Sequence, residues 1–444
     1  MIYNKSSVSN ISSVLRCVNC GHTHSLNDPV YTCSMCGGLL DVEHDLEALR
    51  GVVSRDLFDA RLGALDMPYN SGVWRYKELV FPGISDEQIV TRGEGNTTLY
   101  RTPPKLAAWI GAERLALKHE GENPTGSFKD RGMTGGVTHA MLVNASSVVC
   151  ASTGNTSASM ASYAALAGLQ ALVFFPFGNI AMGKLAQSVA YGALSVQVRG
   201  DFDVCLELVR QSCRQFGIYL LNSVNPFRLE GQKTIIFEIL QQRRWKVPDW
   251  IILPGGNLGN TSAFGKGLHE LLTLGLIDKL PRIAVVQAAG SAPFYASYKN
   301  NFAERMTVKA ETLATAIKIG NPASYFKARR TLEWTNGIVE SVTDQEILDA
   351  KAQVDASGIG CEPASAASVA GVRKLIANGV IRPDEDIVAL LTGHLLKDPG
   401  IVIDYHQDAL AGFTSTYANK MRVIEPTLED VRALLSGQMV NVAQ

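Results

Sequence analysis

Long apolar runs, the residue pattern of a signal peptide and an excess of charge are all missing from this sequence. No apolar run reaches the roughly 18 residues that a membrane-spanning helix needs, and no basic region followed by an apolar core opens the chain. The 41 basic residues nearly balance the 42 acidic ones, so the charge favours neither nucleic acid nor a membrane surface as a partner. We therefore expect a cytoplasmic protein that binds small neutral or anionic metabolites.

A disulfide framework is also missing, because the eight cysteines divide into a tight N-terminal group of four and four scattered ones. The tight group forms two C-x-x-C pairs, each followed by glycine, and consists of Cys17, Cys20, Cys33 and Cys36. Four thiolates in this doubled pattern can bind one zinc ion tetrahedrally. The sequence predicts a zinc-ribbon-like module in residues 1–50, with a metal-free ribbon or a redox-active dithiol pair as the alternatives.

The predicted ribbon has few basic residues and no row of aromatic side chains. Both are features with which ribbons of this kind bind nucleic acid. We therefore expect the ribbon to be a structural or docking element.

From Leu115 onward, short runs of β-forming residues alternate with helix-length stretches. The predicted strands are Ser147–Ala151, Ala171–Phe175, Leu194–Val198, Ile218–Leu221, Trp250–Leu253, Arg282–Gln287 and Asp386–Leu391, and the predicted helices include Phe202–Phe216, Gln232–Arg244 and Ala364–Ala377. Because parallel strands need helical crossovers, the alternation predicts an α/β fold whose parallel sheets carry helices on both faces. Ligands of such sheets bind beyond the carboxyl ends of the strands.

One lysine, Lys129, lies between a turn-forming segment and a predicted helix start. Pro124 and Gly126 favour a turn, and Ser127 can cap the helix that follows. At such a junction backbone N–H groups point outward and attract anions. The alternative is an ordinary solvent-exposed lysine paired with Asp130.

Three predicted strand ends carry polar or glycine-rich segments. The hydroxyl and amide groups of residues 152–159 suit a carboxylate or phosphate at a helix N-terminus, with ordinary helix capping as the alternative. Residues 253–261 form a glycine-rich turn whose N–H groups can surround a phosphate, and the turn is neither a P-loop nor G-x-G-x-x-G. Thr392 can present its hydroxyl to a ring nitrogen or bond to its own backbone.

A reactive lysine and a phosphate-binding loop on one α/β frame suggest a pyridoxal phosphate enzyme. Lysine forms a Schiff base with the cofactor's aldehyde, and the loop can hold the cofactor's phosphate. The combination is more specific than either part alone.

Five segments in the same order resemble the threonine synthases, of the tryptophan-synthase-β-like class of pyridoxal phosphate enzymes. They are Glu122–Met133, Ser152–Ser159, Asn222–Lys233, Gly255–Thr261 and Thr392–Pro399. The resemblance implies a homodimer and two doubly wound parallel-sheet subdomains in residues 51–425, the smaller one in roughly residues 125–222. It assigns no role to the C-terminal tail, residues 426–444.

The resemblance also implies roles for single residues. Lys129 would bind the cofactor covalently and carry protons once substrate displaces it. The remaining cofactor contacts would be Asn155 at the phenolic oxygen, Thr392 at the pyridine nitrogen, and Gly255, Gly256, Asn257, Leu258, Gly259 and Asn260 at the phosphate. The substrate would contact Ser152, Thr153 and Thr156 through its carboxylate and Asn222, Ser223, Arg228 and Lys184 through its phosphate, although Lys184 could equally be a solvated helix lysine.

The implied reaction converts O-phospho-L-homoserine and water to L-threonine and phosphate. One alternative is a relative that acts on another phospho-amino acid, such as a cysteate synthase-like enzyme that uses phosphoserine and sulfite. A dehydratase of threonine or serine would share the cofactor but would not need Arg228 for a second phosphate. The other alternative is a non-catalytic relative that binds partners through the ribbon, and the retention of Lys129 argues against it.

Overall fold

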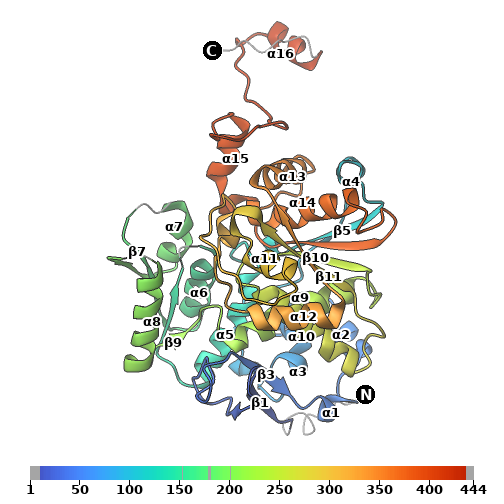
Figure 1. The fold of residues 1–444 in the computed structure, drawn as a ribbon. Coiled ribbons are helices and arrows are strands. Elements are labelled where there is room, and N and C mark those ends of the chain that lie inside the picture. The colour runs from blue at the N-terminus through green and yellow to red at the C-terminus, as the bar shows by residue number, and fades with distance from the viewer. Residues whose placement is uncertain (1–10, 153, 179–181, 201, 437–444) are drawn as a thin grey trace.

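The computed structural model describes residues 11–152, 154–178, 182–200 and 202–436. Within this part of the chain, two α/β layers lie side by side, and a small antiparallel β module packs below the larger one (Figure 1). Besides the elements named below, the helices are α1 (Leu46–Leu49), α2 (Arg55–Ala60), η1 (Trp74–Tyr76), α3 (Lys77–Val80), η2 (Asp86–Gln88), η3 (Glu120–Glu122), η4 (Ala289–Ser291), α11 (Pro293–Lys299), η5 (Thr315–Ile317) and η6 (Leu395–Lys397).

The larger sheet has six strands in the order β12-β11-β10-β13-β5-β4. They are β4 (Leu99–Arg101), β5 (Arg114–His119), β10 (Trp250–Pro254), β11 (Arg282–Ala288), β12 (Ile338–Val342) and β13 (Asp386–Leu391). All neighbours pair in parallel except β4, which runs antiparallel to β5 at the edge. The central strands β10 and β13 are buried along their whole length, as expected for parallel strands that are covered on both faces.

Helices cover both faces of the larger sheet. One face carries α9 (Pro226–Gln242), α10 (Gly259–Thr273) and α12 (Tyr325–Thr335), and the other carries α4 (Pro104–Ile110), α13 (Asp344–Ala356) and α14 (Pro363–Ala377). Alternate side chains of β10 enter the two cores: Ile251 packs with the first group of helices and Ile252 with the second. This period of two is the physical basis of the layered fold.

The smaller sheet has four parallel strands in the order β8-β7-β6-β9. They are β6 (Ser147–Ala151), β7 (Gln170–Pro176), β8 (Leu194–Val198) and β9 (Tyr219–Leu220). Its helices are α5 (Lys129–Leu142), α6 (Asn155–Leu166), α7 (Met182–Ala190) and α8 (Phe202–Phe216). Side chains of α5 and α6 share one core with Val148, while Val149 faces α8 on the opposite side.

The predicted fold class is confirmed, and every predicted strand is present. Three strands of the larger sheet were not predicted, namely β4, β5 and β12. The first is short and antiparallel, and β5 contains the buried Lys118, whose charge hides the strand from a search for apolar runs. The domain boundaries given above stay a prediction.

The N-terminal module consists of β1 (Ser13–Cys17), β2 (Thr23–His24) and β3 (Leu40–His44), paired antiparallel in the order β2-β1-β3. Buried polar and charged side chains attach it to the larger layer. His44 Nε2 lies 3.1 Å from Glu230 Oε2 on α9, and Lys327 Nζ on α12 lies 2.7 Å from Asp41 Oδ1.

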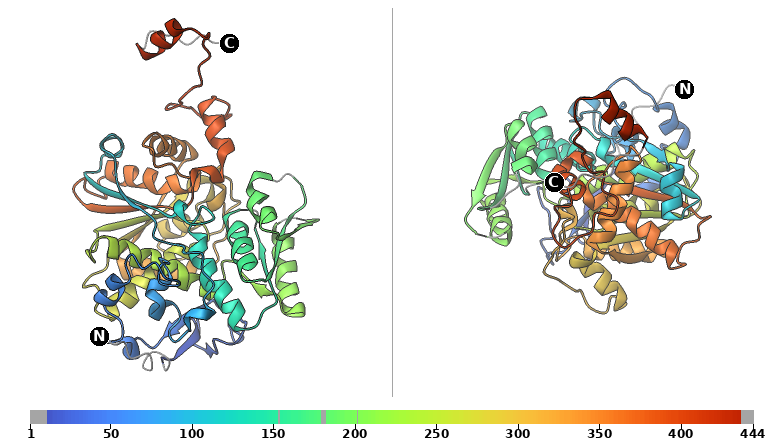
Figure 2. Two further views of the ribbon diagram at one scale, coloured as in Figure 1. Left: turned by 180° about the vertical axis from the view of Figure 1, so that it is seen from behind. Right: turned by 90° about the horizontal axis from the view of Figure 1, so that it is seen from above.

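The C-terminal segment extends away from both layers. After α15 (Pro399–His406) the chain continues outward to α16 (Leu428–Leu435), which stands apart from the body in Figure 1 and in the left view of Figure 2. Leu428 and Leu435 are exposed there. Within residues 11–436, leaving aside the short gaps, the structure contains no helix with both the length and the apolar character needed to cross a bilayer.

Candidate active site

Lys129 is the first residue of α5, and its loop is joined to the segment that follows β13. The Phe128 N–H donates to the Thr392 carbonyl at 3.0 Å, and the His394 N–H donates to the Gly126 carbonyl at 2.9 Å. The fold therefore brings the lysine segment and the Thr392 segment side by side at the carboxyl end of a central strand. Ligands of parallel sheets bind at this edge.

The Lys129 amine lies in a setting that favours its neutral form. Burial of the ammonium group lowers the pKa of Lys129 to about 7; the charge of Arg228 acts in the same direction and that of Glu362 opposes it. Asp130 does not act as the partner of this lysine, since its carboxylate accepts hydrogen bonds from Thr125 and Ser159. The alternative of an exposed lysine paired with Asp130 is therefore wrong.

Glycines let α5 and α9 approach closely enough to place Arg228 near Lys129. A Cβ atom on Gly231 would lie 1.7 Å from the Arg131 carbonyl oxygen, and one on Gly135 would lie 2.8 Å from the Phe227 carbonyl oxygen. Side chains at these positions would force the helices apart. The small residues thus allow Arg228 to lie near Lys129.

Arg228 is a buried cation with spare hydrogen-bonding capacity. Its residue is 2% exposed, its Nη1 donates to the Leu221 carbonyl at 3.0 Å, and its Nε has no acceptor. Burial lowers the pKa of Arg228 to about 10. No carboxylate pairs with it among the residues that the structure describes, so the site can accept an anion at this point.

The N-terminus of α6 and the turn before α9 supply the other predicted substrate residues. Ser152 follows β6, and its Oγ accepts the Gly154 N–H at 3.2 Å; Thr156 lies in the first turn of α6. Asn222 is engaged by the protein, because its Oδ1 accepts the Ala151 N–H at 3.0 Å. Ser223 is half-buried in the turn that leads to α9.

Two predicted substrate residues fall outside the description. Thr153 is not among the described residues, and Lys184 lies in α7 with its side chain outside them. Their proposed roles stay predictions.

The glycine-rich turn after β10 leaves little room for side chains at its first two positions. A Cβ atom on Gly255 would lie 2.6 Å from Val285 Cγ1, and one on Gly256 would lie 3.2 Å from Ile317 Cα. Leu258 adopts a φ of 63° and turns the chain into α10, which begins at Gly259. The amides of the first helical turn have no acceptor within the helix and suit a phosphate.

The two asparagines of this turn differ. Asn260 Oδ1 is buried without a hydrogen-bond partner, so this side chain is available to a ligand. Asn257 accepts the Ala323 N–H through its side chain at 3.3 Å and the Ser324 N–H through its carbonyl at 3.1 Å. Asn257 therefore holds the turn in place.

These residues fit pyridoxal phosphate. Lys129 offers a largely neutral amine, the turn after β10 offers the backbone of a helix start, and the polar side chains of Asn155 and Thr392 are joined through a shared carboxylate, that of Glu362. Thr392 Oγ1 lies 2.9 Å from Ser365 Oγ. The chemistry of these groups suits a ring that carries an aldehyde, a phenolic oxygen and a phosphate.

Sequence reasoning missed Glu362 and Ser365. Both lie at the start of α14, and Glu362 is only 4% exposed. In the sequence, an acidic residue directly before Pro363 has the pattern of an ordinary helix start. Its burial arises from distant contacts, so the sequence carries no local signal of it.

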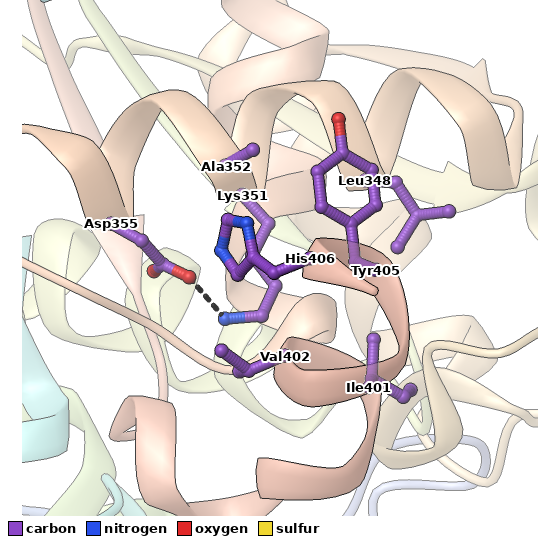
Figure 3. A pocket seen from close by; sticks show the side chains of 8 residues that line it. All are labelled: Leu348, Lys351, Ala352, Asp355, Ile401, Val402, Tyr405 and His406. Atoms are coloured by element: carbon purple, nitrogen blue, oxygen red, sulfur yellow. Dashed lines mark hydrogen bonds and ion pairs between the residues drawn. The ribbon is translucent and has the colours of Figure 1, made fainter. Parts of the chain in front are cut away.

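Two hollows away from the site contain none of the predicted site residues. A cavity of about 10 Å³ between α13 and α15 is lined by Leu348, Lys351, Ala352, Asp355, Ile401, Val402, Tyr405 and His406 (Figure 3), and holds about one water molecule. A groove of about 690 Å³ runs between the N-terminal module and α10 and α12. Neither hollow has the amine and phosphate turn that the cofactor needs.

The four N-terminal cysteines converge. Their sulfur atoms lie within 4.8 Å of one another, with separations of 3.4 Å for Cys17 and Cys36 and 3.6 Å for Cys20 and Cys33. Tetrahedral zinc, with Zn–S bonds of about 2.3 Å, requires sulfur separations of about 3.8 Å, whereas a disulfide requires about 2.05 Å. The donor set therefore fits zinc.

Comparison with known proteins identifies the family. Residues 90–393 match the family described as pyridoxal-phosphate dependent enzyme. A threonine synthase of Methanosarcina acetivorans is 49% identical over 88% of this chain and 93% of that protein. The chain belongs to the threonine synthase family. A threonine synthase of Methanocaldococcus jannaschii is 47% identical over 87% of the chain and 94% of that protein.

Solved structures agree on the fold of this threonine synthase family member. Threonine synthase from Escherichia coli superposes with a TM-score of 0.67 at 17% identity, covering 96% of this chain and 100% of that one. Maize serine racemase gives 0.59 at 20% identity, covering 70% and 94%. The predicted fold and pyridoxal phosphate cofactor are confirmed, and the protein is a lyase of this family. The individual site residues remain predictions.

Proposed function

We propose that the protein converts O-phospho-L-homoserine and water to L-threonine and phosphate, as a cytoplasmic homodimer. The buried, unpaired guanidinium of Arg228 is the observation that supports this choice of substrate. The Gly255–Asn260 turn already suits the cofactor's phosphate, so a second, buried cation without an acidic partner calls for a second phosphate. A substrate without phosphate would leave that charge buried and unsatisfied.

The polar groups around Lys129 orient such a substrate by its two ends. The Ser152 hydroxyl and the N-terminus of α6 receive the carboxylate, and Arg228 with Ser223 receives the phosphate. The substrate carbons then lie across the amine of Lys129.

Proton movement falls to Lys129. Bound pyridoxal phosphate supplies an electron sink for the carbons next to the substrate's amino group. The Lys129 Nζ takes a proton from Cα and then one from Cβ, so that phosphate can leave from Cγ. Protons then return to Cγ and to Cα, and water adds its hydroxyl group at Cβ. A pKa of about 7 suits both steps, because the amine can accept and release a proton near neutral pH.

A substrate comparison tests this proposal. Purified holoenzyme is incubated with phosphohomoserine, or with phosphoserine plus sulfite, and phosphate and amino-acid products are measured. We expect threonine and phosphate from phosphohomoserine alone, and a loss of about 10³-fold or more in Lys129→Ala. Release from phosphoserine and sulfite alone would move the function to a cysteate synthase-like enzyme. A wild-type protein as inactive as Lys129→Ala on both substrates would favour the non-catalytic alternative.

We also propose that the four-cysteine site holds one structural zinc ion. The converging sulfurs support it.

A further inference from the structure

A buried carboxyl group joins the two sides of the active site. Glu362 Oε2 accepts the Asn155 Nδ2–H at 2.9 Å, and its Oε1 accepts the Thr392 hydroxyl at 3.3 Å. Asn155 begins α6 on the smaller sheet, whereas Thr392 follows β13 of the larger one. One side chain thus contacts both residues that are predicted to meet the cofactor ring.

The turn after β13 is shaped around this carboxyl group. A Cβ atom on Gly393 would lie 2.4 Å from Glu362 Cδ, so only glycine leaves room for it. The Ser365 hydroxyl accepts the Thr392 and Gly393 N–H groups at 2.8 and 2.9 Å, and the Glu362 N–H donates to the Gly393 carbonyl at 3.0 Å. The position of Glu362 is therefore set by several independent contacts.

An ion pair behind the site holds the preceding residue. Lys351 Nζ and Asp355 Oδ2 lie 2.7 Å apart, the pair drawn with a dashed line in Figure 3. Lys351 donates to the Cys361 carbonyl at 2.7 Å, and Asp355 Oδ1 accepts the Cys361 N–H at 3.0 Å. The backbone N–H and carbonyl of Cys361 are both held by hydrogen bonds, so the backbone that leads into Glu362 has one orientation.

The charges around Glu362 come from several elements. Lys129 on α5 and Lys397 in η6 face it with positive charge, Asn155 and Thr392 bond to it, and the Cys361 thiol is its neighbour. Burial raises the pKa of Glu362, and the Asn155 hydrogen bond and both lysines only partly oppose this. The group can therefore hold a proton at a higher pH than an exposed glutamic acid.

We propose that Glu362 is a positioning residue of this active site, which orients Asn155 and Thr392 toward the cofactor ring and places an ionisable group in contact with both. Because Thr392 is neutral, the protonation of Glu362 then tunes the charge felt by the bound cofactor and by Lys129. The inference rests on the proposed places of Asn155 and Thr392 at the ring, and not on the identity of the substrate.

Spectroscopy of the holoenzyme tests the role without any substrate. The visible absorbance of bound pyridoxal phosphate is titrated against pH, and its dissociation constant is measured, in wild type, Glu362→Gln and Glu362→Asp. In Glu362→Gln the titration midpoint is expected to fall by about one pH unit, because the amide cannot stabilise a nearby positive charge. The loss of an ideally placed acceptor is expected to weaken cofactor binding about three- to tenfold.

The conservative and control variants separate positioning from folding. Glu362→Asp keeps the ionisable group but is too short to bond both partners, so it should restore the midpoint and not the affinity. Glu340→Gln on β12, whose carboxylate lies 3.8 Å from Lys374, should match wild type in both. A folded Glu362→Gln with wild-type midpoint and affinity would overturn the proposal. If Glu362→Gln does not fold, wild-type affinity in Glu362→Asp would overturn it instead.

Failure of the proposed function would look different. If the wild-type protein does not turn over phosphohomoserine, but Glu362→Gln shows the expected changes in titration midpoint and cofactor affinity, the substrate assignment changes and the role of Glu362 stays supported.

Discussion

Lys129 and Arg131 stand two residues apart at the start of α5, yet their surroundings are opposite in kind. Arg131 is fully buried and paired, with Nε 2.6 Å from Glu120 Oε2 and Nη2 2.8 Å from Glu238 Oε1. Lys118 Nζ lies 2.6 Å from the same Glu238 oxygen. Lys129, whose amine is largely neutral, instead lies near the cation Arg228, which has no acidic partner among the described residues.

The comparison separates groups that hold the fold from groups that await a ligand. Burial alone would raise the pKa of Glu238, but Arg131 and Lys118 outweigh this and lower it below its ordinary range. Arg131 and Lys118 in that cluster each lie against a carboxylate, so the cluster joins α5, α9 and β5. On the Lys129 side, Arg228 has no carboxylate partner among the described residues and its Nε has no acceptor, so an anion can bind there.

Breaking the paired cluster should have the largest effect. Glu238→Gln leaves the buried Lys118 without its carboxylate, and we expect the free energy of unfolding to fall by about 3–5 kcal/mol. Urea denaturation followed by circular dichroism measures it. Glu333→Gln removes a carboxylate that is 59% exposed and pairs with Arg329, and should change stability by less than about 0.5 kcal/mol. Equal losses in the free energy of unfolding for the two variants would contradict the view that Glu238 stabilises the fold through its buried ion pairs.

The same contrast explains what the sequence could and could not predict about the fold. Strands β10 and β13 are buried throughout and appear as apolar runs. Strand β5 was missed because Lys118 interrupts its apolar pattern. That lysine is buried only because it bonds to Glu238, 120 residues further along the chain, and no local pattern encodes such a pairing.

The site residues likewise fall into those that the sequence could predict and those that it could not. Lys129 and the Gly255–Asn260 turn lie in local segments whose turn and helix-start residues point to their chemistry. Glu362 could not be found, since its partner Asn155 lies 207 residues away. Side chains whose burial depends on a contact between the two sheets become visible only in three dimensions.

Removing the unpaired cation should affect catalysis rather than stability. Arg228→Gln is expected to lower kcat/KM for phosphohomoserine about 10- to 100-fold, the magnitude of a lost charged hydrogen bond. Unfolding should be little changed, because no acid is left unpaired. Since Arg228 lowers the pKa of Lys129, its removal should raise that pKa. The acidic limb of the pH–rate profile, which reports this amine as a base, should therefore move to higher pH. Arg329→Gln is the surface control, and a large loss of stability in Arg228→Gln with unchanged kinetics would contradict this view.

The four-cysteine site of the ribbon gathers negative charge, whereas the Lys129 side offers a positive one. Loss of the ribbon's metal should have the smallest effect on turnover of the changes considered. Four thiolates would gather negative charge at one point, so a cation should complete the cluster. We expect about one zinc ion per chain by metal analysis and none in Cys36→Ser. Because His44 bonds to Glu230 on the helix that carries Arg228, loss of the metal should lower kcat/KM about two- to fivefold. Wild-type protein that contains no metal and has a reactive Cys17 would contradict the zinc prediction. It would show that four converging thiols do not by themselves make a metal site.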